Sequence, residues 1–348
     1  MNIAITDMRR SVIRRTLIPM ERVRSGSCYG NLPNDIGRII FELVAEGQDY
    51  SCAHVSKQTQ IWVERVMYRD IVLNTARRGE LFHRTVSCLR DPKSATTKPR
   101  NFFETRVKSL VISFEVNPPY VLPILKACKA VKSLACFFSD GHISSELQAF
   151  VTSTALSPTW LSVPGSIFRR NERVFSHHIF RNLTHLELLW EDEEPELSWS
   201  SWEALSELKQ LTHISVDIQF DTYQPAELAR AILAWCPLTL RIFILYVLFE
   251  SYFLEGSEQL EGLKSIHEGE VDPRAVVGCS QGLNNPDHHR CAIPNIHMKE
   301  FVYQWATVPL MGETMWGLAE RRVEERRRNL KVSSFHRSHD QRLTLEKV

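Results

Sequence analysis

The residues whose types could do metal chemistry lie together near the C-terminus. They are Cys279, His288, His289, Cys291 and His297, in a segment rich in asparagine and proline. Thiolates and imidazoles are common zinc ligands, but a structural zinc site generally draws its ligands from two closely spaced pairs. Here the two cysteines lie far apart and two of the histidines are adjacent. We therefore expect no bound metal and interpret this segment as a polar loop.

A second group of residues could bind a basic peptide. Carboxylates attract a cationic partner at the rim of an interface, and indole rings hold a cation over their faces. A solvated insertion loop anchored by its tryptophans is the alternative. The residues that would form the peptide contact are Trp190, Glu191, Asp192, Glu193, Glu194, Trp199 and Trp202.

Catalytic motifs are absent from the sequence. It has no Gly-x-Gly-x-x-Gly, no phosphate-binding loop, no Gly-x-Ser-x-Gly and no His-Glu-x-x-His. Glycine is scarce, at 14 of 348 residues, so phosphate-cradling loops have little material. We therefore expect neither enzymatic activity nor a cofactor. A metal-dependent enzyme built around residues 279–297 is a less favoured alternative.

Composition describes an ordinary globular protein. Hydrophobic residues make up 43% and charged residues 24%, and the formal net charge of +1 gives no argument for binding nucleic acid or an anionic membrane. No apolar run approaches the roughly 20 residues that span a bilayer. The eight cysteines are dispersed without a Cys-x-x-Cys pair, which is typical of free thiols in a reducing compartment. We expect a cytoplasmic or nuclear location.

The segment 32–73 carries three short helical patterns and a final apolar strand. Pro33 suits the start of a helix, because its missing N–H needs no partner there. The apolar residues that follow recur at helical spacing on one face, namely Ile36, Ile39, Ile40, Leu43 and Val44. Two further helical patterns cover residues 49–57 and the residues around Trp62. About forty residues make a small core, so we expect this segment to rest against a partner.

This segment resembles an F-box, the module through which substrate receptors bind the Skp-type adaptor of a cullin-RING ubiquitin ligase. The matching pieces are Leu32-Pro33, Asp35-Ile36, Ile40-Phe41, Val55-Ser56-Lys57 and the ending Tyr68-Arg69-Asp70-Ile71-Val72-Leu73. Thr59 departs from the family, which usually has an aromatic residue there. The resemblance implies adaptor contacts through Leu32, Pro33, Ile36, Ile40, Val55 and Tyr68. A generic three-helix cap is the alternative.

Beyond residue 100 the chain repeats the pattern apolar-x-x-apolar-x-apolar. The pattern starts at residues 107, 131, 183, 211 and 240, and a less regular copy covers Pro158 to Val163. Alternation of this kind suits a strand with one buried face, and helical patterns separate the copies. A repeat length of roughly 20–29 residues is typical of leucine-rich-repeat proteins. Parallel βαβ units would produce the same alternation.

We therefore predict an α+β or α/β solenoid, with an N-terminal three-helix F-box followed by an irregular leucine-rich-repeat-like array and a C-terminal capping helix. The combination resembles divergent fungal F-box proteins. The expected divisions are a basic disordered tail (1–31), the F-box-like domain (32–73), a connector (74–100), the repeats (101–280), a loop with the capping helix (281–330) and a disordered tail (331–348). A transit peptide is an alternative for the basic tail.

The resemblance implies a substrate-recognition subunit of an SCF-type ubiquitin ligase. Its partners would be a Skp-type adaptor, a cullin scaffold and an unidentified protein substrate held by the repeats, with no nucleic acid and no membrane. Other subunits would carry out the chemistry, and the receptor would act by bringing the target close. A protein-interaction scaffold that promotes no ubiquitination is the alternative.

Overall fold

The protein is described by a computed structural model that covers residues 32–47, 49–91, 98–137, 143–168, 174–189, 202–218, 224–247, 250–280, 293–295 and 314–329. The chain divides into two compact units, Met1–Glu64 and Arg65–Val348. The boundary between the units falls inside a helix. Within the described part of the chain, no helix combines the length and apolarity that a membrane crossing requires.

The N-terminal unit is built around the helices α1 (Asn34–Glu46) and α2 (Lys57–Met67), with the 3₁₀ turn η1 (Ser51–His54) between them. Helix α1 begins directly after Pro33, whose carbonyl accepts hydrogen bonds from the N–H groups of Ile36 and Gly37. Asp49 receives hydrogen bonds from both the N–H and the hydroxyl of Ser51. Such local bonds compete with helix formation, which explains why the second predicted helix is only a short turn.

The second unit contains one sheet of nine parallel strands, which lie side by side in chain order. The strands are β1 (Asp70–Leu73), β2 (Ser109–Ile112), β3 (Ser133–Cys136), β4 (Trp160–Pro164), β5 (His185–Leu189), β6 (His213–Ile218), β7 (Ile242–Val247), β8 (Ala275–Ser280) and β9 (Ile293–Asn295).

Helices and 3₁₀ turns connect most of these strands, because parallel neighbours can be joined only by a crossover. The helices are α3 (Ala76–Arg90), α4 (Phe102–Arg106), α5 (Pro118–Ala127), α6 (Ser145–Thr152), α8 (Pro225–Trp235) and α9 (Glu258–Glu268). The 3₁₀ turns are η3 (Gly165–Phe168), η4 (Val174–Ser176), η5 (His178–Phe180), η6 (Glu203–Glu207) and η7 (Glu250–Phe253). A further helix covers residues 315–329.

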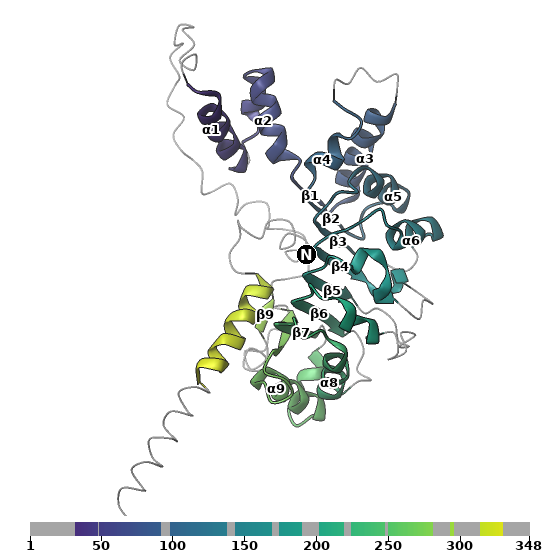
Figure 1. Cartoon of the computed structure of the whole chain (residues 1–348), viewed down its shortest axis with the longest axis vertical. Helices are drawn as coiled ribbons and strands as arrows, with labels where there is room; N and C mark the ends of the chain where they lie inside the picture. The colour runs from purple at the N-terminus through teal and green to yellow at the C-terminus, as the bar shows by residue number, and fades with distance from the viewer. Residues whose placement is uncertain are drawn as a thin grey trace, which may run out of the picture. The chain divides into compact units, whose positions relative to one another are not determined.

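The sheet has two different faces, because successive side chains of a strand point to opposite sides. One face packs against α3, α5, α6, α8 and α9 in the main hydrophobic core. Part of the other face, at β7 and β8, packs against the helix 315–329. Figure 1 shows this helix in yellow, across the strands from α8 and α9.

The main core follows the repeated sequence pattern strand by strand. The fourth residue of each copy occupies the same row of the sheet and is buried; these residues are Leu110, Leu134, Leu161, Leu186, Ile214 and Phe243. Each side chain thus packs beside its equivalent on the next strand. The pattern therefore located β2 to β7 correctly, including the less regular copy at β4.

The predicted fold class was nevertheless wrong. The structure shows an α/β arrangement with one all-parallel sheet and interleaved helices, and not a three-helix F-box followed by a solenoid. The segment 32–73 does not form a separate helical module, since its last four residues are strand β1 of the sheet. The pattern specifies buried strand positions but does not distinguish a solenoid from parallel βαβ units.

Candidate functional site

The first candidate site is an apolar surface on helix α1 in the N-terminal unit. Five large side chains, Ile36, Ile39, Ile40, Leu43 and Val44, are between 37% and 61% exposed, and we call them the α1 face. Leu32, just before the helix, is also exposed. Contiguous exposed apolar surface of this kind marks an interaction site in many proteins.

The opposite side of α1 packs within its own unit. The ring of Phe41 stacks on the indole of Trp62, with centroids 6.2 Å apart. Gly37 approaches the same indole so closely that a Cβ there would be in contact with it, at 3.6 Å. Ala45 is buried. Helix α1 is thus apolar on two sides. Only the side with Phe41 and Ala45 packs against other described residues of its own unit.

The residues predicted to bind the adaptor fall into two groups. Leu32, Pro33, Ile36 and Ile40 are exposed along one stretch of chain, and Val55 is exposed after η1. Tyr68 belongs to the other unit, where it is half-buried and its ring packs edge-on against Phe102 and Phe103, at 5.3 and 5.5 Å.

Three residues of the α1 face were missing from the predicted site, although the sequence pattern contained them. Ile39, Leu43 and Val44 share the helical spacing of Ile36 and Ile40 and are as exposed. The periodicity places all five on one face. It does not tell whether that face is buried or open, so the full extent of the surface required the structure.

Of the residues predicted to bind a basic peptide, only Trp202 lies in the part of the chain that the structure describes. Trp190, the run from Glu191 to Glu194 and Trp199 lie outside the described residues. The Trp202 side chain is fully buried and packs against Phe175, with ring centroids 5.4 Å apart. The structure therefore places Trp202 in the core, where its indole has no surface to offer a peptide.

The cysteine and histidine segment is likewise described only in part. Cys279 is buried on β8, whereas His288, His289, Cys291 and His297 lie outside the described residues. Within the described ranges, no group of histidine, cysteine and acidic side chains is arranged to hold a metal ion.

A second candidate site lies on the sheet face opposite the helices of the main core. Trp160, His185 and His213 occupy one row of β4, β5 and β6. Their rings stack, with centroids 3.9 Å apart for Trp160 and His185 and 4.1 Å apart for the two histidines. Trp316, from the helix 315–329, lies edge-on to both imidazoles.

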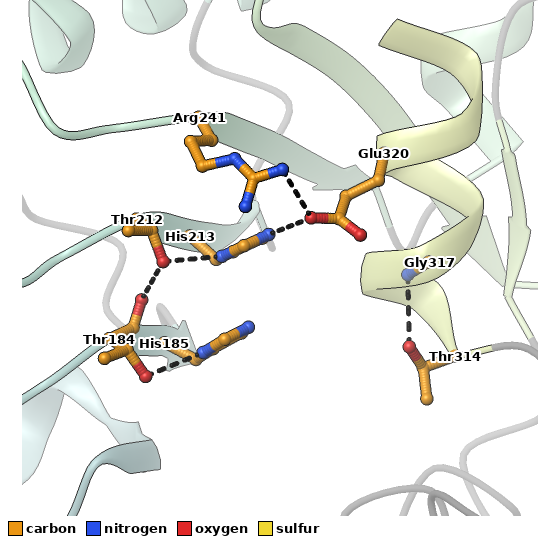
Figure 2. Close-up of polar contacts among 8 residues, drawn as sticks. All are labelled: Thr184, His185, Thr212, His213, Arg241, Thr314, Gly317 and Glu320. Atoms are coloured by element: carbon orange, nitrogen blue, oxygen red, sulfur yellow. Dashed lines mark hydrogen bonds and ion pairs between the residues drawn. The ribbon is translucent and has the colours of Figure 1, made fainter. Parts of the chain in front are cut away.

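Threonines fix the orientation of the two imidazoles (Figure 2). The hydroxyl of Thr184 donates to the carbonyl of Thr159. The hydroxyl of Thr212 donates to the carbonyl of Thr184, as Figure 2 shows. Each hydroxyl has one proton, so its oxygen must accept from the neighbouring Nδ1–H of His185 or His213, at 2.9 and 2.8 Å. We call Thr184, His185, Thr212 and His213 the Thr–His ladder.

The Thr–His ladder has poor properties for acid–base catalysis near neutral pH. Burial lowers the pKa of His185 to about 3, with smaller contributions from His213 and Arg241. Burial also lowers the pKa of His213, although Glu320 opposes this effect. General acid–base catalysis works best with a pKa near the working pH. His185 therefore stays neutral in that range.

Four polar side chains continue this face toward the carboxyl ends of the strands. Ser162, Glu187 and Ser215 are register partners on β4, β5 and β6, and Asp217 follows Ser215 on the same side of β6. All four are buried. We call them the polar strip. Its burial was not predictable from the sequence, because a polar residue that alternates with apolar ones in a strand normally faces solvent.

Comparisons with known proteins supply no family for this chain: no family model matches it, and no curated protein is detectably similar to it.

Proposed function

We propose that the chain is a substrate-recognition subunit of a cullin-RING ubiquitin ligase, which binds a Skp-type adaptor through residues 32–55 and a target protein through the α/β unit. The observation that carries the proposal is the α1 face, a set of large aliphatic side chains left exposed on a single helix. The resemblance of the 32–73 sequence to the F-box family suggests the adaptor as its partner. The cytoplasm or the nucleus is the corresponding location.

The energetics of the α1 face support a stable complex. A fully desolvated aliphatic side chain contributes about 1.5–3 kcal/mol, and Leu43 alone is 61% exposed in the free chain. Central apolar side chains usually dominate the affinity of an interface. We therefore expect Ile40 and Leu43, near the middle of the surface, to matter more than Leu32 at its end.

The test is co-purification of the full chain with the Skp-type adaptor. The variant Ile40→Glu/Leu43→Glu places two charges in the proposed interface and should lose the adaptor. Leu238→Glu is a matched control, because Leu238 is fully exposed after α8 in the other unit. Both sites are exposed, so both variants should keep the thermal stability of the original chain.

Three results would contradict the proposal or narrow it. Failure of the folded original chain to capture the adaptor would exclude the ligase role. Capture that survives Ile40→Glu/Leu43→Glu would exclude the α1 face as the binding surface. Adaptor capture without cullin recruitment or target ubiquitination would indicate the scaffold alternative.

A further inference from the structure

Positive charge is concentrated where the chain enters strands β1, β2 and β3. The three segments that lead into these strands, 65–70, 98–108 and 126–132, carry nine lysines and arginines but only two acids, Asp70 and Glu104. The whole chain has a formal net charge of only +1. Because β1, β2 and β3 are parallel neighbours (Figure 1), their amino ends lie at one edge of the sheet. The cations therefore gather at this edge.

Three of these cationic residues lie directly side by side. The N–H of Lys108 donates to the carbonyl of Arg69, and the N–H of Lys132 donates to the carbonyl of Lys108, each at 2.8 Å. Neighbouring strands are about 4.8 Å apart, so the three residues occupy roughly 10 Å of the edge. We call Arg69, Lys108 and Lys132 the basic row.

The basic row is only partly neutralised within the described chain. Arg69 pairs with Asp70 at 2.9 Å, and the second acid, Glu104, is engaged by a different lysine at 3.4 Å. Lys108 and Lys132 are exposed and form no ion pair with any described residue. Like charges on directly neighbouring strands repel and destabilise a sheet. An anionic partner would remove this repulsion, so the charge pattern is that of a binding surface.

The side chains of the basic row define the chemistry of the partner. Arginine has a planar fork that selects one geometry, whereas lysine is a flexible point charge. The guanidinium of Arg69 is already paired, so the free charges of the row are lysines, which respond to the density of negative charge. An extended peptide rises about 3.3 Å per residue, which lets neighbouring acidic side chains reach cations about 4.8 Å apart. A cluster of aspartates or glutamates fits this requirement.

Nucleic acid is the other polyanion to consider, and this edge suits it less well. Proteins that bind duplex DNA neutralise many phosphates along its backbone, but the basic row ends after three strands, because the equivalent residues before β4, β5 and β6 are threonines. Single strands are usually held by stacking on aromatic side chains. The rings of Tyr68 and Phe102 pack edge to face, and Lys98 lies over both, at 5.0 and 4.5 Å. They therefore offer little surface to a base.

We propose that the basic row binds an acidic segment of the target protein, in which neighbouring aspartates or glutamates pair chiefly with Lys108 and Lys132. The inference rests on the proposed function, since it names the chemistry of the target. It assigns the target contact to the amino ends of β1, β2 and β3, in a different unit from the α1 face.

The test uses a blocked peptide with a central run of glutamates, together with the same peptide carrying glutamines, each labelled with an uncharged fluorophore. Fluorescence anisotropy measures binding to the full chain at low and at high salt. The glutamate peptide should bind about fivefold or more tightly than the glutamine peptide at low salt, because several modest ion pairs act together. High salt should weaken this binding, since exposed charges are screened.

Two double variants locate the contact. Lys108→Gln/Lys132→Gln should weaken the glutamate peptide about fivefold or more, and it should keep or raise the thermal stability, because it removes a repulsion. Lys209→Gln/Lys264→Gln is the matched control, which removes two positive charges from the turn before β6 and from α9. Its affinity for the peptide should stay within about twofold of the original.

The proposal is overturned if the glutamate peptide does not bind the folded chain, if the glutamine peptide binds equally well, or if Lys108→Gln/Lys132→Gln leaves the affinity unchanged. It is also overturned, in favour of nucleic acid, if a single-stranded oligonucleotide of equal charge binds more tightly than the glutamate peptide and loses that affinity in the same variant.

Adaptor capture is measured on the same preparations and depends on the α1 face. Failure of peptide binding with intact adaptor capture would therefore remove only the contact at the basic row. Failure of adaptor capture would instead remove the proposed function.

Discussion

The Nε2 atom of His213 lies 3.2 Å from a carboxylate oxygen of Glu320, and this contact joins β6 to the helix 315–329 (Figure 2). Arg241 approaches the same oxygen at 3.4 Å. The Nδ1 atom of His213 donates to Thr212, so a neutral ring would offer only a lone pair to the carboxylate. A protonated His213 ring can donate from Nε2 to this carboxylate.

The first prediction concerns the pKa of His213. Burial lowers this pKa, the charge and hydrogen bond of Glu320 raise it, and Arg241 lowers it. Glu320→Gln removes the negative charge that raises the pKa of His213, so this pKa should fall further. An NMR titration of the His213 ring in the full chain measures the change.

Glu324→Gln is the matched control, since Glu324 lies one turn further along the same helix and pairs with Arg328. It should leave the pKa of His213 unchanged. An unchanged pKa in Glu320→Gln as well would mean that the contact between His213 and Glu320 is not formed in solution.

The second prediction concerns acid stability and His185. Its pKa is about 3 in the folded chain, against about 6.5 in the unfolded chain. Below pH 6.5 only the unfolded chain takes up this proton, so the contribution of His185 to stability is lost as the pH falls from 6.5 toward 3. His185→Phe keeps a ring between Trp160 and His213 and removes the titration.

Urea unfolding near pH 7 and near pH 4.5 measures this effect. Between these values the original chain should lose more stability than His185→Phe, by about 2–3 kcal/mol. The loss of the Thr184 contact affects His185→Phe at both pH values, so the difference between the two losses isolates the titration. Equal losses in the two proteins would show that His185 is not held neutral.

The third prediction compares two glycines inside helices. A Cβ at Gly79 in α3 would lie 2.7 Å from a methyl carbon of Val116, whereas a Cβ at Gly262 in α9 would meet nothing closer than 3.4 Å. Alanine favours helices over glycine by roughly 0.5–1 kcal/mol. Gly262→Ala should therefore raise the free energy of unfolding, and Gly79→Ala should lower it by about 1–3 kcal/mol through overpacking.

A double variant identifies the cause. Val116→Ala removes the methyl groups that the new Cβ would meet, so Gly79→Ala should cost less in that background. If Gly79→Ala costs the same with and without Val116, the clash is not the reason for the loss.

The sequence predicted the strands far better than their assembly. Alternation with a buried side chain at every second position is a local property, and each copy, from Leu110 to Phe243, is found as a strand. Helices α5, α6 and α8 also lie between the copies of the pattern, as the helical patterns there predicted. How the units pack together depends on contacts between distant residues, and the same local pattern fits more than one assembly.

The candidate sites were harder to predict, for two physical reasons. Glu187 and Asp217 alternate with apolar residues, a pattern typical of solvent-facing positions, but both are buried. The helical spacing of Ile39 and Leu43 located an apolar face but not its exposure. Burial is set by which elements cover a face, and a single sequence carries little information about that.

The last prediction tests the placement of Trp202 in the core. Its side chain is fully buried against Phe175, so Trp202→Ala should lower the free energy of unfolding by about 3–5 kcal/mol. Leu238→Ala is the control at a fully exposed position and should change it by less than about 0.5 kcal/mol. Urea unfolding of both variants measures the two losses. A small loss for Trp202→Ala would mean that the indole is not buried, and would restore Trp202 as a candidate for the peptide contact.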